Sequence, residues 1–221
     1  MQNEKIIFLG VGKGIVNALR RIVRSNIHGV GFAFTSMTDY VVDYYVDVPI
    51  KFHVQNFNDC EKIVKEKFSD TDIIFVFVCA NEADELSLAS KFAQEAKAAG
   101  ILTIGLVIIS GGFNDFAKFT GSFKSPYDTV FFLHSYSCSR CETYQKIIEC
   151  ISDLINKSGF VNLDLADVKT ILRNSGEGKF GKSYFGGCNR ALNAATEAVH
   201  NVSLISERVF GGKKFFDDNF V

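Results

Sequence analysis

A chain of 221 residues is long enough to bury a sizeable core and corresponds to one or two domains. Hydrophobic residues make up 47% of it, with 22 Phe and no Trp, which indicates a folded globular protein and excludes a disordered one. The 24 basic and 25 acidic residues leave a formal net charge of −1, so charge gives no reason to expect a nucleic-acid partner.

The chain shows no targeting or membrane segment. The apolar run near the N-terminus, within MQNEKIIFLGVGKG, is too short and too rich in glycine for a signal peptide. No run approaches the roughly 18 to 20 apolar residues that a membrane helix needs. The six cysteines do not look like a disulfide framework in a chain of this length without an export signal. We therefore expect a soluble cytoplasmic protein with no membrane partner.

Apolar runs and helical apolar periodicities alternate along the chain. Lys5–Leu9 predicts a short strand, and after a glycine turn Ile15–Ser25 carries apolar residues at helical spacing. Asp72–Cys79 is almost wholly apolar, as expected of a central strand that is buried on both faces. Further strands are predicted at Val30–Thr35, Tyr45–Val54, Ile101–Ile109 and Thr129–Leu133, and further helices at Cys60–Phe68, Glu82–Ala99, Cys141–Lys157 and Leu165–Arg173. Strands that alternate with helices predict an α/β fold with a Rossmann-like parallel sheet flanked by helices.

One loop places an amide and two carboxylates at a fixed spacing, between two of the predicted helices. Its Asn162, Asp164 and Asp167 closely resemble the synergy loop of the tubulin/FtsZ family, whose pattern is Gly-x-x-Asn-x-Asp-x-x-Asp. The resemblance implies a loop that reaches into the pocket of the next subunit in a filament and helps to hydrolyse the GTP held there. From the residues alone, Asp164 and Asp167 also fit a plain helix start, as N-cap and N3.

The resemblance covers most of residues 5–201. A match to the family's first phosphate loop is formed by Gly10, Gly12, Gly14 and Asn17. Thr38-Asp39 is similar to part of the second loop, and Asn189-Arg-Ala resembles a helix further along. The resemblance implies the tubulin/FtsZ GTPase-domain fold over residues 1–175, including its central helix, and a residual start of the C-terminal domain over 176–221.

The nucleotide pocket is where this chain departs from the family. The family signature Gly-Gly-Gly-Thr-Gly-Thr-Gly, whose glycines let backbone N–H groups approach phosphates, aligns on residues 81–87, which contain no glycine. Glu82, Asp84 and Glu85 instead bring negative charge there, which disfavours a phosphate group. The same segment fits a self-capped helix, with Asn81 as N-cap and Asp84 completing a capping-box-like pair.

The residues that contact the guanine base are also replaced. The family's aspartate at the start of the central helix aligns with Cys141, and the asparagine of its base loop aligns with Ser135. We therefore expect no cofactor. If the pocket does function, the resemblance implies GTP or GDP with Mg²⁺, held by the first-loop glycines and Asn17.

Two further segments match motifs of known chemistry. Residues 176–183 fit the phosphate-loop pattern Gly-x4-Gly-Lys-Ser, but a helix precedes them where a strand is required, which favours a chance match. Cys138 and Cys141, with His134 nearby, invite a zinc or redox interpretation. They do not complete a four-ligand set, so no metal site is predicted.

These observations lead to a degenerate FtsZ-like protein that has lost ordinary GTP binding and acts through protein contacts, in a filament or a regulatory complex. We expect a protein partner, either FtsZ itself or a second copy of this chain, and no catalysis by this chain alone. One alternative is a working FtsZ-like GTPase with an atypical pocket. A more distant one is a metal or redox protein built around Cys138 and Cys141.

Overall fold

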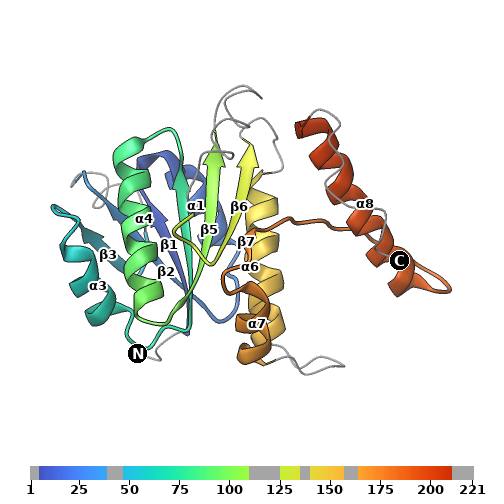
Figure 1. Cartoon of the computed structure of the whole chain (residues 1–221), viewed down its shortest axis with the longest axis horizontal. Coiled ribbons are helices and arrows are strands. Elements are labelled where there is room, and N and C mark those ends of the chain that lie inside the picture. Colours follow the sequence, from blue (N-terminus) through green and yellow to red (C-terminus); the bar gives the residue numbers. More distant parts are fainter. Residues whose placement is uncertain (1–4, 39–46, 110–124, 135–139, 157–163, 211–221) are drawn as a thin grey trace. The chain divides into compact units, whose positions relative to one another are not determined.

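The computed structural model describes residues 5–38, 47–109, 125–134, 140–156 and 164–210 (Figure 1). The described residues fall into two compact units. The main unit contains every strand of the sheet and the helices up to α7, and it ends at Gly178. The second unit contains Lys179 onward, with the helix α8 (Arg190–Phe210). That residues 176–221 begin a second domain remains a prediction.

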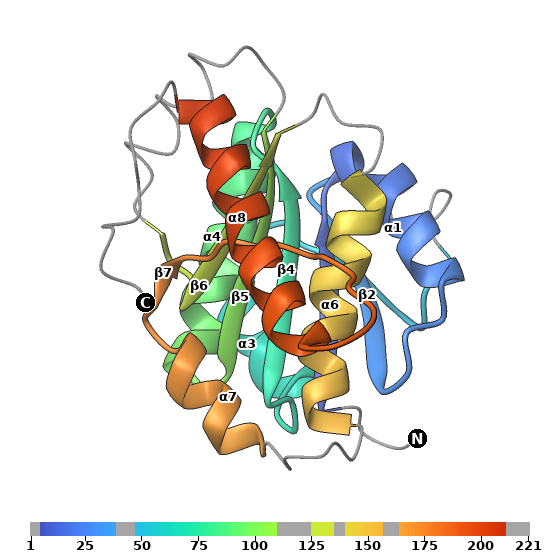
Figure 2. The same cartoon turned by 90° about the vertical axis from the view of Figure 1, so that its right-hand side faces the viewer.

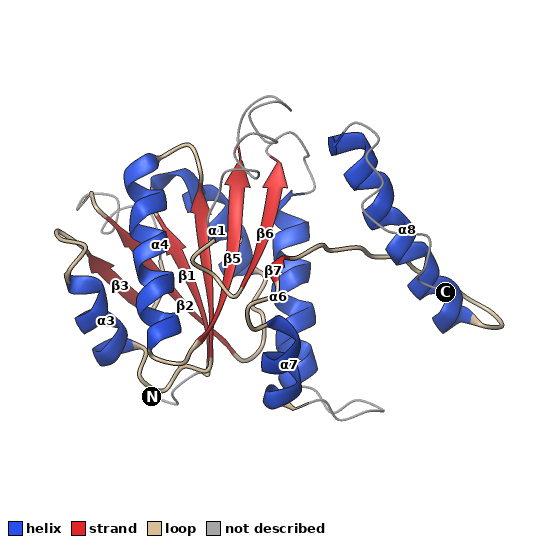
Figure 3. Cartoon of the chain, viewed as in Figure 1, coloured by secondary structure: helices blue, strands red, loops and turns tan. Residues whose placement is uncertain are grey.

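The main unit is built on a seven-stranded parallel sheet with the order β3-β2-β1-β4-β5-β6-β7 (Figure 3). Its strands are β1 (Ile6–Val11), β2 (Val30–Ser36), β3 (Ile50–His53), β4 (Ile73–Cys79), β5 (Leu102–Ile109), β6 (Thr129–His134) and β7 (Gly176–Glu177). From β1 the chain builds outward to β2 and β3, and then crosses back to place β4 on the other side of β1. The direction of building therefore reverses between β1 and β4.

Helices cover both faces of this sheet. Helices α3 and α4 pack together on one face, and α1 and α6 on the other (Figures 1 and 2). The bounds are η1 (Lys13–Ile15), α1 (Val16–Arg24), α3 (Asp59–Lys67), α4 (Ala83–Ala98), α6 (Arg140–Asn156) and α7 (Leu165–Leu172). No helix in the described ranges is long and apolar enough to span a bilayer.

Aromatic side chains fill the space between the sheet and each helical layer. On one face, the ring of Phe77 lies 4.7 Å from Tyr144 of α6 and 5.5 Å from Phe8 of β1, centroid to centroid. On the other face, Phe52 of β3 lies 5.7 Å from Phe92 of α4. Such edge-on and tilted pairs add to the stabilisation from burial. The many phenylalanines therefore help to bury both faces of the central strands.

The predicted α/β class and the parallel sheet are confirmed, and most predicted elements agree with the structure to within two residues at each end. The strand predicted over Tyr45–Val54 is wrong in extent, because only Ile50–His53 form a strand among its described residues, 47–54. It begins directly after Pro49, which has no N–H to donate to a neighbouring strand. The short strand β7 was not predicted at all.

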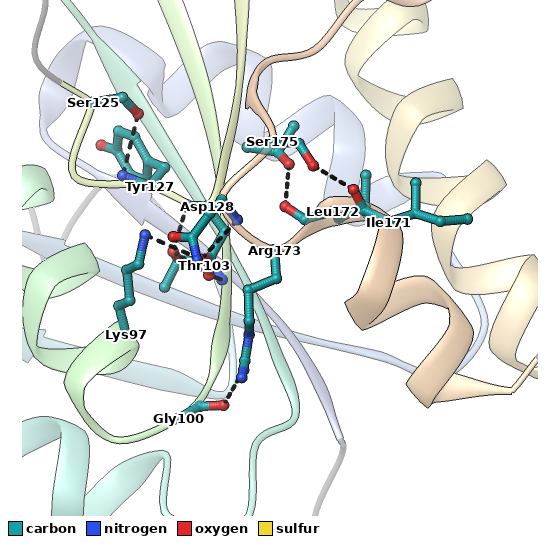
Figure 4. A network of polar contacts seen from close by, with 12 residues as sticks. Lys97, Gly100, Thr103, Ser125, Tyr127, Asp128, Ile171, Leu172, Arg173 and Ser175 are labelled. Carbon is teal, nitrogen blue, oxygen red and sulfur yellow. Dashed lines mark hydrogen bonds and ion pairs between the residues drawn. The ribbon is translucent and has the colours of Figure 1, made fainter.

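A buried carboxylate holds together the end of the sheet at which β5 and β6 begin (Figure 4). Asp128 is 1% exposed, and its Oδ2 accepts hydrogen bonds from the backbone N–H of Thr103 at 2.9 Å and from the Thr103 hydroxyl at 3.1 Å. Its Oδ1 lies 3.1 Å from the ammonium of Lys97 at the end of α4 and accepts from the N–H of Asn174 at 3.3 Å. One side chain therefore joins β5, β6, α4 and the segment after α7.

Burial on its own would raise the pKa of Asp128, but the hydrogen bonds from Thr103 and the ammonium of Lys97 outweigh it and hold the pKa below its ordinary value. The folded state therefore binds a proton less readily than the unfolded state. The stabilisation from this carboxylate is present above the ordinary value of 3.8 and is lost as the pH falls through the lower folded pKa.

We predict that Asp128→Asn lowers the free energy of unfolding at pH 7 by about 1.5–3 kcal/mol, because hydrogen bonds to a charged group are lost from a buried site. Denaturant unfolding monitored by circular dichroism measures the effect. The difference from the wild type should shrink below pH 4, where the wild-type carboxylate also gains a proton. Asp47→Asn, at an exposed carboxylate, is the control, with an expected change within about 0.5 kcal/mol. A variant as stable as the wild type at pH 7 would contradict the role of Asp128.

Candidate functional site

The candidate site lies at the carboxyl ends of β1 and β4, where the strand order reverses. Open parallel sheets bind their ligands in the crevice at such a switch point. Two segments meet there: the turn after β1, which contains Gly12 and Gly14, and the start of α4, which follows β4. The fold thus brings the glycine loop and the acidic segment, both singled out in the sequence, to one place.

The side chain of Glu85 lies at this switch point, against Gly12. Glu85 is 7% exposed, and its Oε1 accepts a hydrogen bond of 2.7 Å from the hydroxyl of Ser36, at the end of β2. Its other oxygen, Oε2, is buried and has no hydrogen-bond partner among the described residues. A carboxylate of the protein itself therefore fills space in which a bound anion would otherwise be expected.

The two loop glycines leave room for the acidic side chains at the start of α4. A β-carbon added to Gly12 would stand 2.7 Å from Cγ and 2.9 Å from Cδ of Glu85, which is too close for any real side chain. Gly12 also has a φ of +84°, in the region that favours glycine. A β-carbon on Gly14 would stand 2.9 Å from Cβ of Cys79 and 3.1 Å from Oε1 of Glu82. Both glycines are thus accounted for by contacts within the chain.

The other residues predicted for the first phosphate loop have different surroundings. A β-carbon on Gly10 would meet the side chains of Ile15 and Leu19, each at 2.8 Å, so Gly10 lets the first helical turn pack closely on β1. Asn17 is exposed on α1. The N–H of Gly12 already donates to the carbonyl of Thr35, at 2.9 Å. That N–H is therefore not available to a phosphate in this structure.

The start of α4 differs from the sequence prediction. Its N-cap is Glu82, not Asn81, and no side chain caps the helix there. The predicted capping pair of Asn81 and Asp84 is therefore wrong. With Glu82 as N-cap, the N3 position falls on Glu85, whose carboxylate turns to Ser36 and not back to the helix backbone. Asp84 stays exposed.

Ser36 is a site residue that the sequence interpretation did not identify. Its hydroxyl donates to Glu85 and accepts a hydrogen bond of 3.1 Å from the N–H of Thr38, so it links α4 to the turn after β2. The backbone carbonyl of the following residue, Met37, lies 2.9 Å from Nε2 of His53 on β3. The only signal for Ser36 in the sequence was a hydroxyl directly after an apolar strand. Asp39, matched to the second loop, lies outside the described residues.

Burial raises the pKa of the Glu85 carboxyl above its ordinary value. The hydrogen bond from the Ser36 hydroxyl and the nearby Met37 backbone oppose this rise, and the nearby carboxylates of Glu82 and Asp84 add to it. The direction is opposite to that of Asp128, because no described cation faces Glu85. The crevice is therefore a place where negative charge costs free energy.

The acidic loop residues lie at the start of α7. Asp164 is the N-cap and accepts a 2.9 Å hydrogen bond from the N–H of Asp167, whose carboxylate accepts from the N–H of Asp164 at 3.1 Å. This is a reciprocal capping box, as the plain helix-start interpretation predicts. Both residues are exposed, so their outer faces are accessible. Asn162 lies outside the described residues, and a contact between subunits through this loop remains a prediction.

The remaining motifs do not form a further site among the described residues. Residues 176–183 begin with the strand β7, but the next helix begins only at Arg190, so no helix N-terminus opens on Lys182 and Ser183 as a phosphate loop requires. Cys138 lies outside the described residues, as does the side chain of Cys141. Within the described ranges no group of three or more His, Cys, Asp or Glu side chains could hold a metal ion.

Comparison with known proteins identifies the relatives of this chain. No protein-family model matches it. It is 25% identical over 247 residues to the cell division protein FtsZ 2 of Rhizobium meliloti (strain 1021), an alignment that covers 95% of this chain and 71% of that protein. It is also 25% identical over 241 residues to the cell division protein FtsZ of Buchnera aphidicola subsp. Schizaphis graminum (strain Sg), covering 91% of this chain and 62% of that one.

A solved structure gives the same result for the fold. The empty FtsZ dimer of M. jannaschii matches with a TM-score of 0.65 at 15% sequence identity, over 92% of this chain and 71% of that one. Together, the aligned relatives and the matching seven-stranded sheet define the class of protein: a Rossmann-like domain of the tubulin/FtsZ type. The chain is a divergent tubulin/FtsZ-like protein.

We predict that Glu85→Gln raises the free energy of unfolding at pH 7. The folded wild type binds a proton at Glu85 more tightly than the unfolded chain does, so its stability falls as the pH rises from the ordinary value of 4.5 through the folded pKa. The amide has nearly the same shape, can accept from Ser36, and carries no charge. Thermal unfolding between pH 4 and pH 8 should show a gain that grows with pH.

Asp84→Asn is the matched control, because Asp84 is an exposed carboxylate in the same helical turn. It should give no gain, since its charge is solvated and is favoured by the helix dipole. If Glu85→Gln were less stable than the wild type at pH 7, the charge of Glu85 would have to be compensated in the folded protein, which contradicts a site where negative charge costs free energy.

Proposed function

We propose that this chain is a degenerate FtsZ-like protein, which acts through protein contacts in a cell-division-related filament or in its regulation and does not bind GTP in the ordinary way. The aligned relatives named as cell division proteins support the general role. The chain spans 62% of one and 71% of the other, so the activity of a whole relative is part of the proposal.

The observation that carries the loss of GTP binding is the placement of Glu85. Its side chain occupies the crevice at the switch point, lies against Gly12 and adds negative charge where a phosphate would have to sit. Two unit charges 4 Å apart repel by about 1 kcal/mol in water and by several times that at a partly dry site. A triphosphate would therefore have to displace Glu85 and also overcome the charges of Glu82 and Asp84.

We predict that the purified protein binds neither GTP nor GDP with micromolar affinity and does not hydrolyse GTP. Calorimetric titration at millimolar Mg²⁺ and a phosphate-release assay measure this, with a polymerising FtsZ as the positive control. Micromolar binding, or a turnover that disappears in Asp167→Ala, would favour the alternative of a GTPase with an atypical pocket.

Charge also bears on assembly. If copies stacked head to tail as the family resemblance implies, Asp164 and Asp167 of one copy would approach Glu82 and Asp84 of the next. All four are acidic, and none makes an ion pair with another described residue. Without nucleotide and cation between them, each close pair costs about 1 kcal/mol even when well screened. Self-polymerisation by this geometry is therefore disfavoured.

The face that carries Asp164 and Asp167 is still suited to a partner whose own pocket holds GTP. We predict that this protein docks onto the end of an FtsZ filament through Asn162, Asp164 and Asp167, and blocks further growth because its other end cannot receive a subunit. Light scattering of FtsZ with substoichiometric amounts of this protein should show shorter polymer.

The variant must remove charge without undoing the helix start. The double substitution Asp164→Ser with Asp167→Gln keeps a capping box of the Ser-x-x-Gln type, so α7 should stay folded. It should no longer shorten the polymer, whereas Asp47→Asn should act like the wild type. If the wild-type protein left the polymer length unchanged, or if the double variant shortened the polymer equally, Asp164 and Asp167 would serve only as a helix start.

A further inference from the structure

The first turn of α4 carries negative charge that the described part of the chain does not balance. Two other acidic side chains near α4 do have cationic partners: Glu95 of α4 pairs with Lys91, and buried Asp128 pairs with Lys97. Glu82, Asp84 and Glu85 make no ion pair with any described residue. This group of three is called the acidic turn below.

Ordinary helix chemistry explains only part of the acidic turn. Carboxylates in the first turn of a helix are stabilised by its dipole, which accounts for exposed Asp84 and partly exposed Glu82. Glu85 is different, because it is 7% exposed and its buried Oε2 lacks a hydrogen-bond partner among the described residues. Buried charges in proteins are paired or bound to metal. A positively charged group in the crevice would supply what is missing.

We propose that the crevice between β1 and β4 receives a cationic side chain of a partner protein, an arginine foremost, at the place where related sheets hold their ligands. Exposed Asp84 and partly exposed Glu82 are accessible to the incoming cation, and Glu85 lies deeper, on Gly12. A planar guanidinium can bridge two carboxylates with paired hydrogen bonds, which a small ammonium cannot do as well. This inference rests on the proposed function, because it names the chemistry of the partner at the same site.

The test uses the full chain and two small probes. N-acetyl-arginine amide carries the guanidinium, and N-acetyl-citrulline amide is its neutral counterpart of nearly the same shape. Titration followed by NMR of the backbone amides should show saturable shifts at Gly12, Gly14 and Glu85 with the arginine probe and none with citrulline. Glu85→Gln should weaken the binding about tenfold, as expected when a hydrogen bond to a charged group is lost.

The matched control is Glu66→Gln, an exposed carboxylate of α3 that is 3.8 Å from Lys62, and it should leave arginine binding unchanged. Absence of shifts, equal shifts with citrulline, or equal affinity of Glu85→Gln would overturn the inference. A Ca²⁺ or Mn²⁺ titration separates another outcome: saturation of the same amides by the metal, without arginine binding, would make this a metal site and contradict the proposal.

The two proposals can fail separately. GTP binding by the wild type would overturn the proposed loss of nucleotide binding, whatever the arginine probe does. Failure of the arginine probe in a protein that also does not bind GTP would overturn only the inference about the partner.

Discussion

The close contact between Glu85 and Gly12 fixes how α4 meets the carboxyl edge of this sheet. Because Gly12 has no side chain, the carboxylate can lie directly on the turn after β1 and still reach the hydroxyl of Ser36 on β2. The contact joins α4, β1 and β2 through side chains of the protein itself. It also gives the glycine-rich turn a structural role, because Gly12 leaves room for a side chain of the protein itself.

Asp128 and Glu85 are both buried carboxylates of the main unit, at opposite ends of its strands. Asp128 meets an ammonium group and N–H donors, and its pKa is lowered. Glu85 meets one hydroxyl, the Met37 backbone and two other carboxylates, and its pKa is raised. A buried polar group with hydrogen-bond or ionic partners contributes to the stability of the fold. A buried polar group without such partners lowers the stability, and such groups are common at functional sites. The contrast agrees with a candidate site at the carboxyl edge.

The fold could be predicted from the sequence because its strongest signals are local. The apolar runs of β4 and β5 are typical of strands in the middle of a parallel sheet, which are buried on both faces. The capping box of Asp164 and Asp167 is likewise local, because it is complete within four residues. The placement of Glu85 could not be predicted in this way. With Glu82 and not Asn81 as the N-cap, the N3 position falls on Glu85. The side chain of Glu85 is held by Ser36 and lies against Gly12, and both of these residues are far from it in the sequence.

The reciprocal hydrogen bonds at the start of α7 have a consequence for recognition. Asp164 and Asp167 each hold the other's backbone N–H, so both carboxylates keep one orientation before any partner arrives. Ordering a side chain on binding costs about 0.5–1.5 kcal/mol, and groups already fixed in place avoid most of that loss. Any protein that docks here meets a rigid pair of charges whose spacing is set by a helix turn. The start of α7 therefore has the entropic character of a preformed template, although Asp164 and Asp167 are exposed.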